Sequence, residues 1–454
     1  MEKTTRIKVP EQKPEIRRYN FDEVSVGYDF IQAKAEALRC LDCKNPLCVK
    51  GCPVGINIPE FIRELKKDNL DGAVAALKRD NNLPSICGRV CPQESQCEKY
   101  CIRNKIDEPV CIGGLERYVG DYALEASAKN EKNPTNGKRI AVVGSGPAGL
   151  SCAGELAREG FEVTVYEAFH KLGGVLVYGI PEFRLPKKLV EKEISKLTEQ
   201  GVKFELDVVV GQTINMEELT ESFDAVFLGT GAGLPKFMNI KGENLNGVYS
   251  ANEYLTRINL MKAYKAESDT PINAGKRVAV VGAGNVAMDS ARTAIRLGGE
   301  VSIVYRRSKE EMPARKAEII HAEEEGVKLE LLTNPIEILG ENGKVIGIKC
   351  VKMELGEPDA SGRLRPIVIP DSEFIIECDQ VIMALGTNPN PLIKKNYGQL
   401  KSSERGTLTV DENGETSVKN VFAGGDAVTG SATVIKAMGA GKLASKTIKK
   451  RLGV

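Results

Sequence analysis

Cysteine is the reactive residue with the most uneven distribution in this chain. Nine of the 12 cysteines lie in its first quarter, most of them in two runs: Cys40-x2-Cys43-x4-Cys48-x3-Cys52-Pro53 and Cys87-x3-Cys91-Pro92-x4-Cys97-x3-Cys101. Thiolates are soft, charged donors that bind zinc and iron. Several thiolates on short loops, with a Cys-Pro step, are typical of small helical domains that hold iron–sulfur clusters.

The two runs predict two clusters, because in two-cluster domains the fourth cysteine of a run often ligates the other cluster. This rule divides seven cysteines into two sets: Cys40, Cys43, Cys48 and Cys101 for one cluster, and Cys52, Cys91 and Cys97 for three corners of a second. Structural zinc is the alternative. Zinc cannot pass electrons, however, and the rest of the chain indicates redox chemistry.

A glycine motif between residues 139 and 167 indicates a bound dinucleotide. An apolar β-rich run leads into Gly144-Ser145-Gly146-Pro147-Ala148-Gly149, a helical pattern follows, and a second β-rich run ends at Glu167. Such glycines make the tight turn, let the backbone approach the pyrophosphate and pack helix on strand. The helix N-terminus favours phosphate, and the terminal acid accepts the ribose hydroxyls.

Residues 277–307 repeat this unit with one informative change. Gly282 and Gly284-Asn285 match the first motif, Ala287 replaces the third glycine, and the acid at the strand end gives way to Arg306-Arg307. A guanidinium pairs with a 2′-phosphate, which an acid would repel. The second nucleotide is therefore predicted to be NADP(H). A solvated arginine pair is the alternative.

Two further strands show that the first nucleotide fold is interrupted. One ends at Gly229-Thr230-Gly231, and the other, near the C-terminus, runs into Gly424-Gly425-Asp426. The prolines and glycines of Gly179–Lys187 (GIPEFRLPK) suit a bound isoalloxazine, and a cation there would stabilise the reduced flavin. Arg184 is the preferred candidate and Lys187 the second, with a structural salt bridge as the alternative for Arg184.

These elements predict an α/β protein of two nested Rossmann-like domains behind a helical iron–sulfur domain, with helices at 30–40 and 57–79. The FAD-binding domain is expected in two segments, 138–240 and 390–454, with the NADP(H)-binding domain, 241–389, inserted between them. Residues 1–125 are expected to form the helical domain and 126–137 a linker. A length of 454 residues suits about three domains.

Composition excludes several functions. A net charge of +1 gives no basic footprint for nucleic acid. No run approaches the roughly 18–20 apolar residues that span a bilayer. The N-terminal residues lack the apolar segment of a secretory signal, so we expect a cytoplasmic protein with reduced thiols.

The ordered motifs GSGPAGL, GIPEFRLPK, GAGNVAMD, VYRR and AGGDAVTG behind the cysteine-rich region resemble one family over essentially the whole length. It is that of the NADPH-dependent glutamate synthase small subunit, with the large subunit of NADH-dependent ferredoxin:NADP oxidoreductase as a close relative and dihydropyrimidine dehydrogenase as a more distant one. The resemblance implies FAD, NADP(H) and two 4Fe-4S clusters.

The resemblance also implies roles for individual residues. The second cluster's fourth ligand follows an Ile-Gly-Gly-Leu sequence, which makes Glu116 that ligand, with a solvated surface glutamate as the alternative. The loop that contains Gly173 and Gly174 is similar to one that closes over the flavin, and Asp426 corresponds to an aspartate that meets the ribityl chain.

In such proteins NADPH reduces the flavin, and electrons pass through the clusters to a partner subunit. The partner is an FMN amidotransferase in glutamate synthase and a ferredoxin-NADP reductase-like flavoprotein in the electron-bifurcating enzyme; ferredoxin is a further candidate. Arg184, where lysine is common in the glutamate synthase branch, favours the bifurcating branch. A disulfide reductase is disfavoured because no CxxC lies beside the flavin motifs. A non-catalytic redox sensor is the alternative from another class.

Overall fold

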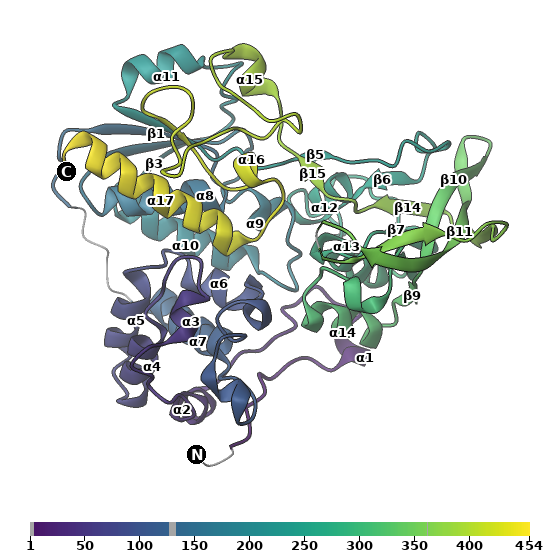
Figure 1. Cartoon of the computed structure of the whole chain (residues 1–454), viewed down its shortest axis with the longest axis horizontal. Helices are drawn as coiled ribbons and strands as arrows, with labels where there is room; N and C mark the ends of the chain where they lie inside the picture. Colours follow the sequence, from purple (N-terminus) through teal and green to yellow (C-terminus); the bar gives the residue numbers. More distant parts are fainter. Residues whose placement is uncertain (1–3, 127–132, 361) are drawn as a thin grey trace.

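The computed structural model describes residues 4–126, 133–360 and 362–454. Figure 1 shows a helical domain beneath one α/β domain and beside a second. An antiparallel sheet extends the second α/β domain away from the first. This arrangement confirms the predicted fold class of two doubly wound domains and a helical N-terminal domain.

The helical domain contains short helices joined by the cysteine-bearing loops. Its elements are α2 (Phe30–Leu38), α3 (Leu47–Lys50), α4 (Ile58–Lys66), α5 (Leu70–Lys78), α6 (Pro84–Val90), the 3-10 turns η1 (Gln93–Ser95) and η2 (Ile102–Lys105), and α7 (Ile112–Glu125). The prediction of a single helix over 57–79 is wrong. Asp68 adopts a left-handed φ of 61°, and Asn69 caps a new helix through the backbone N–H of Gly72.

The first α/β domain has a parallel five-stranded sheet in the order β16-β4-β1-β2-β3. Its N-terminal segment comprises β1 (Arg139–Val143), α8 (Pro147–Ala157), β2 (Glu162–Tyr166), α9 (Val175–Tyr178), α10 (Lys187–Glu199), β3 (Lys203–Glu205), α11 (Met216–Ser222) and β4 (Ala225–Leu228). Its C-terminal segment comprises α15 (Leu392–Asn396), β16 (Val421–Ala423), α16 (Asp426–Thr429) and α17 (Val434–Leu452).

The second α/β domain repeats this plan in a parallel sheet of order β6-β14-β7-β8-β9. It comprises β6 (Val248–Ser250), α12 (Ala251–Asn259), β7 (Arg277–Val281), α13 (Asn285–Arg296), β8 (Glu300–Val304), η3 (Lys309–Glu311), α14 (Lys316–Glu324), β9 (Lys328–Glu330) and β14 (Gln380–Met383). Between β9 and β14 the chain forms an antiparallel sheet of β10 (Thr333–Glu341), β11 (Lys344–Pro358), β12 (Leu364–Val368) and β13 (Phe374–Glu377).

Two short strands mark where the second domain is inserted into the first. β5 (Leu234–Pro235) leaves the first domain, β15 (Thr387–Asn388) returns to it, and the two pair antiparallel. The predicted insertion boundaries at 241 and 389 fall beside these strands. Of the predicted linker, residues 127–132 lie outside the described residues, and residues 133–137 form a loop.

The N-terminal arm, which we define as residues 10–26, leaves the helical domain and packs on the second α/β domain. It contains α1 (Pro14–Arg17), and Figure 1 shows α1 beside α14. The buried Arg17 side chain pairs there with Glu324 and Glu325. The segment predicted as one helical unit, 1–125, therefore includes residues that belong spatially to the nucleotide-binding domains. None of the described helices could cross a membrane.

Candidate functional site

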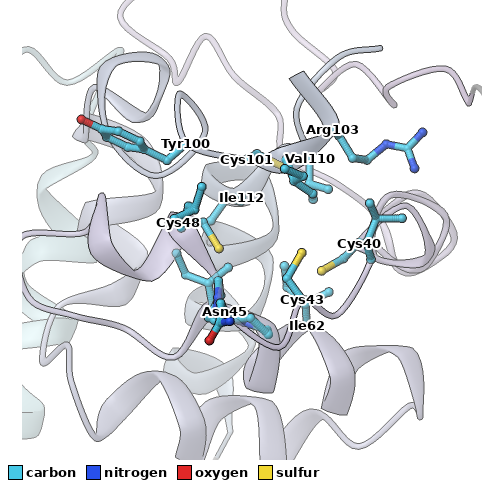
Figure 2. Close-up of a pocket in the computed structure, with 16 residues that line it drawn as sticks. Cys40, Cys43, Asn45, Cys48, Ile62, Tyr100, Cys101, Arg103, Val110 and Ile112 are labelled. Atoms are coloured by element: carbon cyan, nitrogen blue, oxygen red, sulfur yellow. The ribbon is translucent and has the colours of Figure 1, made fainter. Parts of the chain in front are cut away.

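Four cysteines surround one cavity of about 170 Å³ in the helical domain. Figure 2 shows the Cys40, Cys43 and Cys48 sulfurs turned toward a common space, with Cys101 at its edge. Cys40 follows α2, Cys48 lies in α3 and Cys101 precedes η2, so three separate turns supply the ring. Ile58, Ile62, Val110 and Ile112 make the rest of the lining largely apolar.

Electrostatics explain why this ring suits a positively charged centre. Burial, together with the neighbouring thiolates, raises the pKa of Cys40 and raises the pKa of Cys48 to about 12. Four thiolates so close in an apolar cavity repel one another unless a cation compensates them. Iron in a cluster supplies that compensation, so these residues fit the group that the sequence implies.

The second predicted set also converges, in the interior of the helical domain. Cys91 and Cys97 are buried and Cys52 is half-buried. Burial raises the pKa of the Cys52 and Cys97 thiols, and a hydrogen bond with Cys87 together with burial raises the pKa of the Cys91 thiol. The charge of Glu116 adds to all three shifts, so the four predicted ligands lie close to one another.

Glu116 is not a surface residue. It lies on α7 with 5% exposure and accepts a hydrogen bond of 2.8 Å from Asn81 Nδ2. Burial raises the pKa of its carboxyl to about 8. Because the Glu116 side chain is buried beside three thiols, the alternative of a solvated surface glutamate is excluded.

Within the described residues, no group of three or more His, Cys, Asp or Glu side chains meets the geometry of a bound metal ion. The remaining cysteines of this domain, Cys87 and Cys111, are buried, and Cys87 Sγ lies 3.5 Å from Met438 Sδ on α17 of the first α/β domain.

The first glycine motif lies at the start of α8, beside the C-terminal ends of β1 and β4. Gly144 has φ of 99°, and a Cβ there would lie 2.6 Å from the Gly229 carbonyl oxygen. A Cβ at Gly149 would lie 1.9 Å from the Gly144 carbonyl oxygen. By contrast, a Cβ at Gly146 would meet nothing within 4 Å. The helix N-terminus thus faces open space, as pyrophosphate binding requires.

Glu167 borders the same space at the end of β2. Its buried carboxylate accepts hydrogen bonds from Ser145 N and Phe169 N, both at 2.9 Å. Ser145 Oγ in turn accepts a 2.9 Å bond from Gly173 N, and a Cβ at Gly174 would lie 2.9 Å from Gly146 Cα. The predicted flavin loop therefore closes directly over the glycine turn.

The other predicted flavin residues converge on this turn from the C-terminal end of the chain. A Cβ at Gly425 would lie 3.0 Å from Ala148 Cβ, and burial raises the pKa of the adjacent Asp426 to about 6. Thr230 and Gly231 follow β4, and a Cβ at Gly231 would meet open space. Segments far apart in the sequence thus meet at the glycine turn, beside the C-terminal ends of the strands, where open α/β sheets bind their ligands.

The second glycine motif has the same geometry at the start of α13. A Cβ at Gly282 would lie 2.4 Å from the Ala384 carbonyl oxygen, whereas a Cβ at Gly284 would meet nothing within 4 Å. Asn285 Oδ1 accepts a 2.9 Å bond from Arg315 N, and Ala287 is fully buried. This turn therefore also leaves the helix N-terminus open for phosphate.

The two arginines after β8 differ in their surroundings. Arg306 is exposed. Arg307, predicted with it as a ligand of the 2′-phosphate, is buried and donates to the Leu364 carbonyl oxygen at 2.7 Å and to Asp359. The hairpin between β11 and β12 thus holds Arg307, because a buried guanidinium needs acceptors. Arg306 is the better candidate for the phosphate.

The cations of the Gly179–Lys187 segment are both bound by protein groups. Arg184 Nη1 lies 2.7 and 2.8 Å from the carboxylate oxygens of Asp289, and Arg184 Nε lies 3.0 Å from Glu318. Lys187 Nζ donates to the carbonyl oxygens of Ile180 and Leu185, and burial lowers its pKa to about 7. For Arg184 the geometry is that of the structural salt bridge rather than of a cation reserved for a flavin ring.

Sequence reasoning missed two features near these sites. One is the N-terminal arm, whose polar, proline-bearing sequence has no periodic pattern. The other is Glu193 on α10, which is 2% exposed and accepts a 3.0 Å bond from Ser85 N at the start of α6. A glutamate in an otherwise amphipathic helix gives no signal of burial, because the partner that buries it lies in another domain.

Comparisons with known proteins match both the helical part of the chain and its nucleotide-binding part. The family model described as dihydropyrimidine dehydrogenase domain II, 4Fe-4S cluster, matches residues 17–128. The model of the pyridine nucleotide-disulphide oxidoreductases matches residues 138–441.

Among relatives, the "Glutamate synthase [NADPH] small chain" of Escherichia coli is 37% identical over 99% of this chain and 98% of its own length. The "NADP(+)-dependent formate dehydrogenase subunit beta" of Moorella thermoacetica is 38% identical over 89% of this chain and 60% of its own length. The "NADPH-Fe(3+) oxidoreductase subunit beta" of Geobacter sulfurreducens is 38% identical over 93% and 66%.

Solved structures share the fold of the nucleotide-binding domains. Mycobacterium tuberculosis FprA in complex with NADPH superposes with a TM-score of 0.59 and 22% identity, covering 71% of this chain and 85% of FprA. The thioredoxin reductase of T. acidophilum gives a TM-score of 0.52 at 21% identity, covering 70% of this chain and 100% of that one.

Proposed function

The chain belongs to the family of NADPH-dependent flavin and iron–sulfur oxidoreductase subunits that includes the glutamate synthase small chain, and we propose how its own residues serve that activity. It is an oxidoreductase with an FAD/NADP fold and a 4Fe-4S domain. In such enzymes NADPH supplies a hydride, the flavin accepts it, and iron–sulfur centres carry single electrons. The role of the protein is to bind, orient and tune these groups.

For FAD we propose the crevice at the start of α8. Gly144, Gly146 and Gly149 shape the turn, and the open space in front of Gly146 takes the pyrophosphate. Glu167 accepts the ribose hydroxyls, while Gly173-Gly174, Gly229-Thr230-Gly231 and Gly425-Asp426 border the remainder of the cofactor. Lys187, held by two carbonyl oxygens, fixes the bend of the Gly179–Lys187 segment beside the ring.

For NADP(H) we propose the matching crevice at the start of α13. Gly282, Gly284, Asn285 and Ala287 form its phosphate turn, and the exposed Arg306 pairs with the 2′-phosphate. Arg307 supports this pocket indirectly, by anchoring the β11–β12 hairpin behind it.

In the helical domain we propose two clusters. Cys40, Cys43, Cys48 and Cys101 hold the outer one, and Cys52, Cys91, Cys97 and Glu116 hold the inner one. Support comes from the cavity that the first four residues line and from the burial of Cys91, Cys97 and Glu116 in the second set. The carboxylate of Glu116 would give the inner cluster a harder, oxygen ligand in place of a fourth thiolate, and so tune its potential.

We propose further that the chain passes electrons to a partner subunit in the cytoplasm, where thiols stay reduced. One candidate is the ferredoxin-NADP reductase-like partner of an electron-bifurcating transhydrogenase, with ferredoxin as acceptor; Arg184 favours this branch. The second candidate is the large subunit of glutamate synthase. The near-complete mutual coverage with the Escherichia coli small chain supports the second candidate, whereas formate dehydrogenase and Fe(3+) oxidoreductase relatives carry additional residues.

The observation that carries this proposal is the ring of four thiols around one apolar cavity in the same chain as two open dinucleotide turns. Anaerobic purification under native conditions, with identification of whatever co-purifies, tests the partner. Recovery of an amidotransferase supports glutamate synthase, and recovery of a ferredoxin-NADP reductase-like flavoprotein supports the bifurcating enzyme. NADPH-driven reduction of an artificial dye by the chain alone separates an enzyme from a redox sensor.

A further inference from the structure

The N-terminal arm is a closed loop. Gln12 N donates to the Val24 carbonyl oxygen at 2.9 Å, and Val26 N donates to the Pro10 carbonyl oxygen at 2.7 Å. These bonds join the two ends of the arm, residues 10–12 and 23–26, which we call its base. Residues 13–22, which include α1, form its tip, and the bonds hold this tip at a fixed distance from the base. The loop therefore behaves as one body in its contacts with the rest of the chain.

The tip is fixed to the second α/β domain. Arg17, 2% exposed, pairs with Glu325 at 3.0 Å and with Glu324 at 2.5 Å. Arg296 Nε donates to the Asn20 carbonyl oxygen at 2.8 Å, and the Phe21 ring stacks on Tyr264 with centroids 4.1 Å apart. Polar and aromatic contacts thus anchor the tip on the domain that we assign to NADP(H).

The base of the arm is fixed to the other two domains. Glu23 pairs with Arg89 of α6 at 2.7 Å and with Arg117 of α7 at 3.1 Å in the helical domain. Val24 N donates to the Phe183 carbonyl oxygen at 2.9 Å in the flavin domain. A single loop of 17 residues, 10–26, therefore joins all three domains.

Buried ion pairs continue this connection from the arm to the proposed flavin segment. Glu325 accepts from Arg17, Arg292 and Arg296, and its pKa is about 2 because these guanidinium groups outweigh its burial. Arg292 also pairs with Glu318, which pairs with Arg184. Arg292 and Arg296 lie over the ring of Phe183, the neighbour of Arg184, at 4.8 and 3.8 Å.

We infer that the N-terminal arm sets the angle between the NADP(H) domain and the flavin, which makes Arg17 a positioning residue for hydride transfer. The inference rests on the proposed function, because it needs a nucleotide on each α/β domain. Apart from the arm, the two domains are joined by the short β5–β15 pair, by Asn259 of α12, which donates to the carbonyl oxygens of Tyr178 and Gly179, and by the ion pairs of Arg184. The arm therefore adds to a small set of contacts that oppose rotation about the β5–β15 pair. A displacement of about 1 Å at the reacting atoms can cost roughly 100-fold in rate.

Arg17 can be removed without leaving a buried carboxylate unpaired. Four arginines meet three buried carboxylates in the network: Arg17, Arg184, Arg292 and Arg296 with Asp289, Glu318 and Glu325. Without Arg17, Glu325 keeps two guanidinium partners, and Glu324 is half-exposed. The Arg17→Met variant is therefore expected to fold, since the severe penalty falls on uncompensated buried charges.

The test compares Arg17→Met with the wild-type full chain in anaerobic stopped-flow reduction of the flavin by NADPH. We expect the rate to fall at least about tenfold in the variant. Reduction by dithionite, FAD content and the Kd for NADP+ should be unchanged, and Arg17→Lys should restore some of the rate. Hydrogen exchange of the protein without added nucleotide should rise in residues 10–26 and in α14. Lys13→Met, an exposed change on the same arm, is the control and should behave as wild type.

A flavin reduction rate in Arg17→Met equal to that of wild type would overturn the inference while leaving the proposed function intact. Absence of NADPH-driven reduction in the wild type would instead overturn the function. If Arg17→Met does not fold, the same flavin reduction rate is measured in Glu23→Gln, because this change weakens the contact of the base of the arm with the helical domain. A slowed reduction with unchanged NADP+ affinity supports the inference, and a wild-type rate contradicts it.

Discussion

Arg184 and Asp289 form a bidentate ion pair across the two α/β domains, with Arg184 Nη1 2.7 and 2.8 Å from the two carboxylate oxygens. Their side chains are 7% and 4% exposed, respectively. Burial raises the pKa of Asp289 to about 6 in spite of the guanidinium, which shows that desolvation of this carboxylate is unfavourable. Removal of one partner would leave the other charge buried and uncompensated, and this costs more free energy than burial of the intact pair. It joins the segment beside the proposed flavin to the first turns of the NADP(H) helix.

Removal of Arg184 is predicted to destabilise the chain strongly. Arg184→Met leaves the Asp289 carboxylate buried without its main partner, which costs about 3–5 kcal/mol in the free energy of unfolding. Urea denaturation measures this loss. The control is Arg257→Met, which breaks a half-exposed pair with Glu253 and should cost less than about 1 kcal/mol. Equal losses in the two variants would contradict the structural role of Arg184.

Preference for NADPH is predicted to depend on Arg306. Arg306→Glu should lower kcat/KM for NADPH by about 10- to 100-fold, the worth of a charge-assisted contact, and should leave that for NADH unaffected. The control is Lys309→Met, which breaks an exposed pair with Glu323 close to the same strand end and should leave the ratio of kcat/KM for NADPH to that for NADH unchanged. A native preference for NADH would refute the assignment.

Loss of the Glu116 carboxylate is predicted to affect one cluster only. Glu116→Ala should lower iron from about eight toward about four atoms per chain, or change the EPR signal of the inner cluster, and leave the outer one intact. Glu125→Gln, an exposed change at the end of the same helix, serves as the control. Unchanged iron content and unchanged EPR spectra of both clusters would show that Glu116 is not a ligand.

The folding stability is predicted to depend on pH through Glu193. Burial raises the pKa of this carboxyl from 4.5 to about 7, against the opposing effects of Ser85 N–H and Lys78. The folded chain therefore binds more protons than the unfolded chain between these values, and stability falls as pH rises through that window. Glu193→Gln keeps an acceptor for Ser85 N and does not titrate.

Denaturation of wild type and Glu193→Gln at several pH values measures this effect. We expect the variant to lack about 1–3 kcal/mol of the wild-type decline between pH 4.5 and 7. Glu191→Gln, on the same helix but 62% exposed, should leave the wild-type curve unchanged. Parallel curves for wild type and Glu193→Gln would contradict the raised pKa.

The features of the molecule that could be predicted from sequence are those fixed by local chemistry. The glycine turns at Gly144 and Gly282 need a backbone conformation and a close approach that few other residues tolerate, so their motifs can be recognised in the sequence. The cysteine runs can be recognised because cluster ligands come from short loops. The α/β class follows from strand and helix patterns that repeat within about 30 residues.

The features that could not be predicted depend on partners distant in sequence. Asp289 lies 105 residues after Arg184 and shows no local sign of the pairing. Arg307 resembles Arg306 in sequence, and only the fold of the β11–β12 hairpin distinguishes them. The helix break at Asp68 is set by the left-handed conformation of this residue and by the capping side chain of Asn69. The apolar period continues across the break, so the pattern does not indicate it.

We propose that one chain connects a pyridine nucleotide, a flavin and iron–sulfur clusters. Anaerobic titration of the purified or reconstituted chain with NADPH, followed by visible absorbance and EPR, shows whether electrons pass between them. We predict brown protein whose flavin absorbance bleaches and whose reduced-cluster EPR signals appear, with yellow FAD released on denaturation. Colourless protein that contains only zinc after anaerobic reconstitution, or flavin that NADPH does not reduce, would contradict the claim.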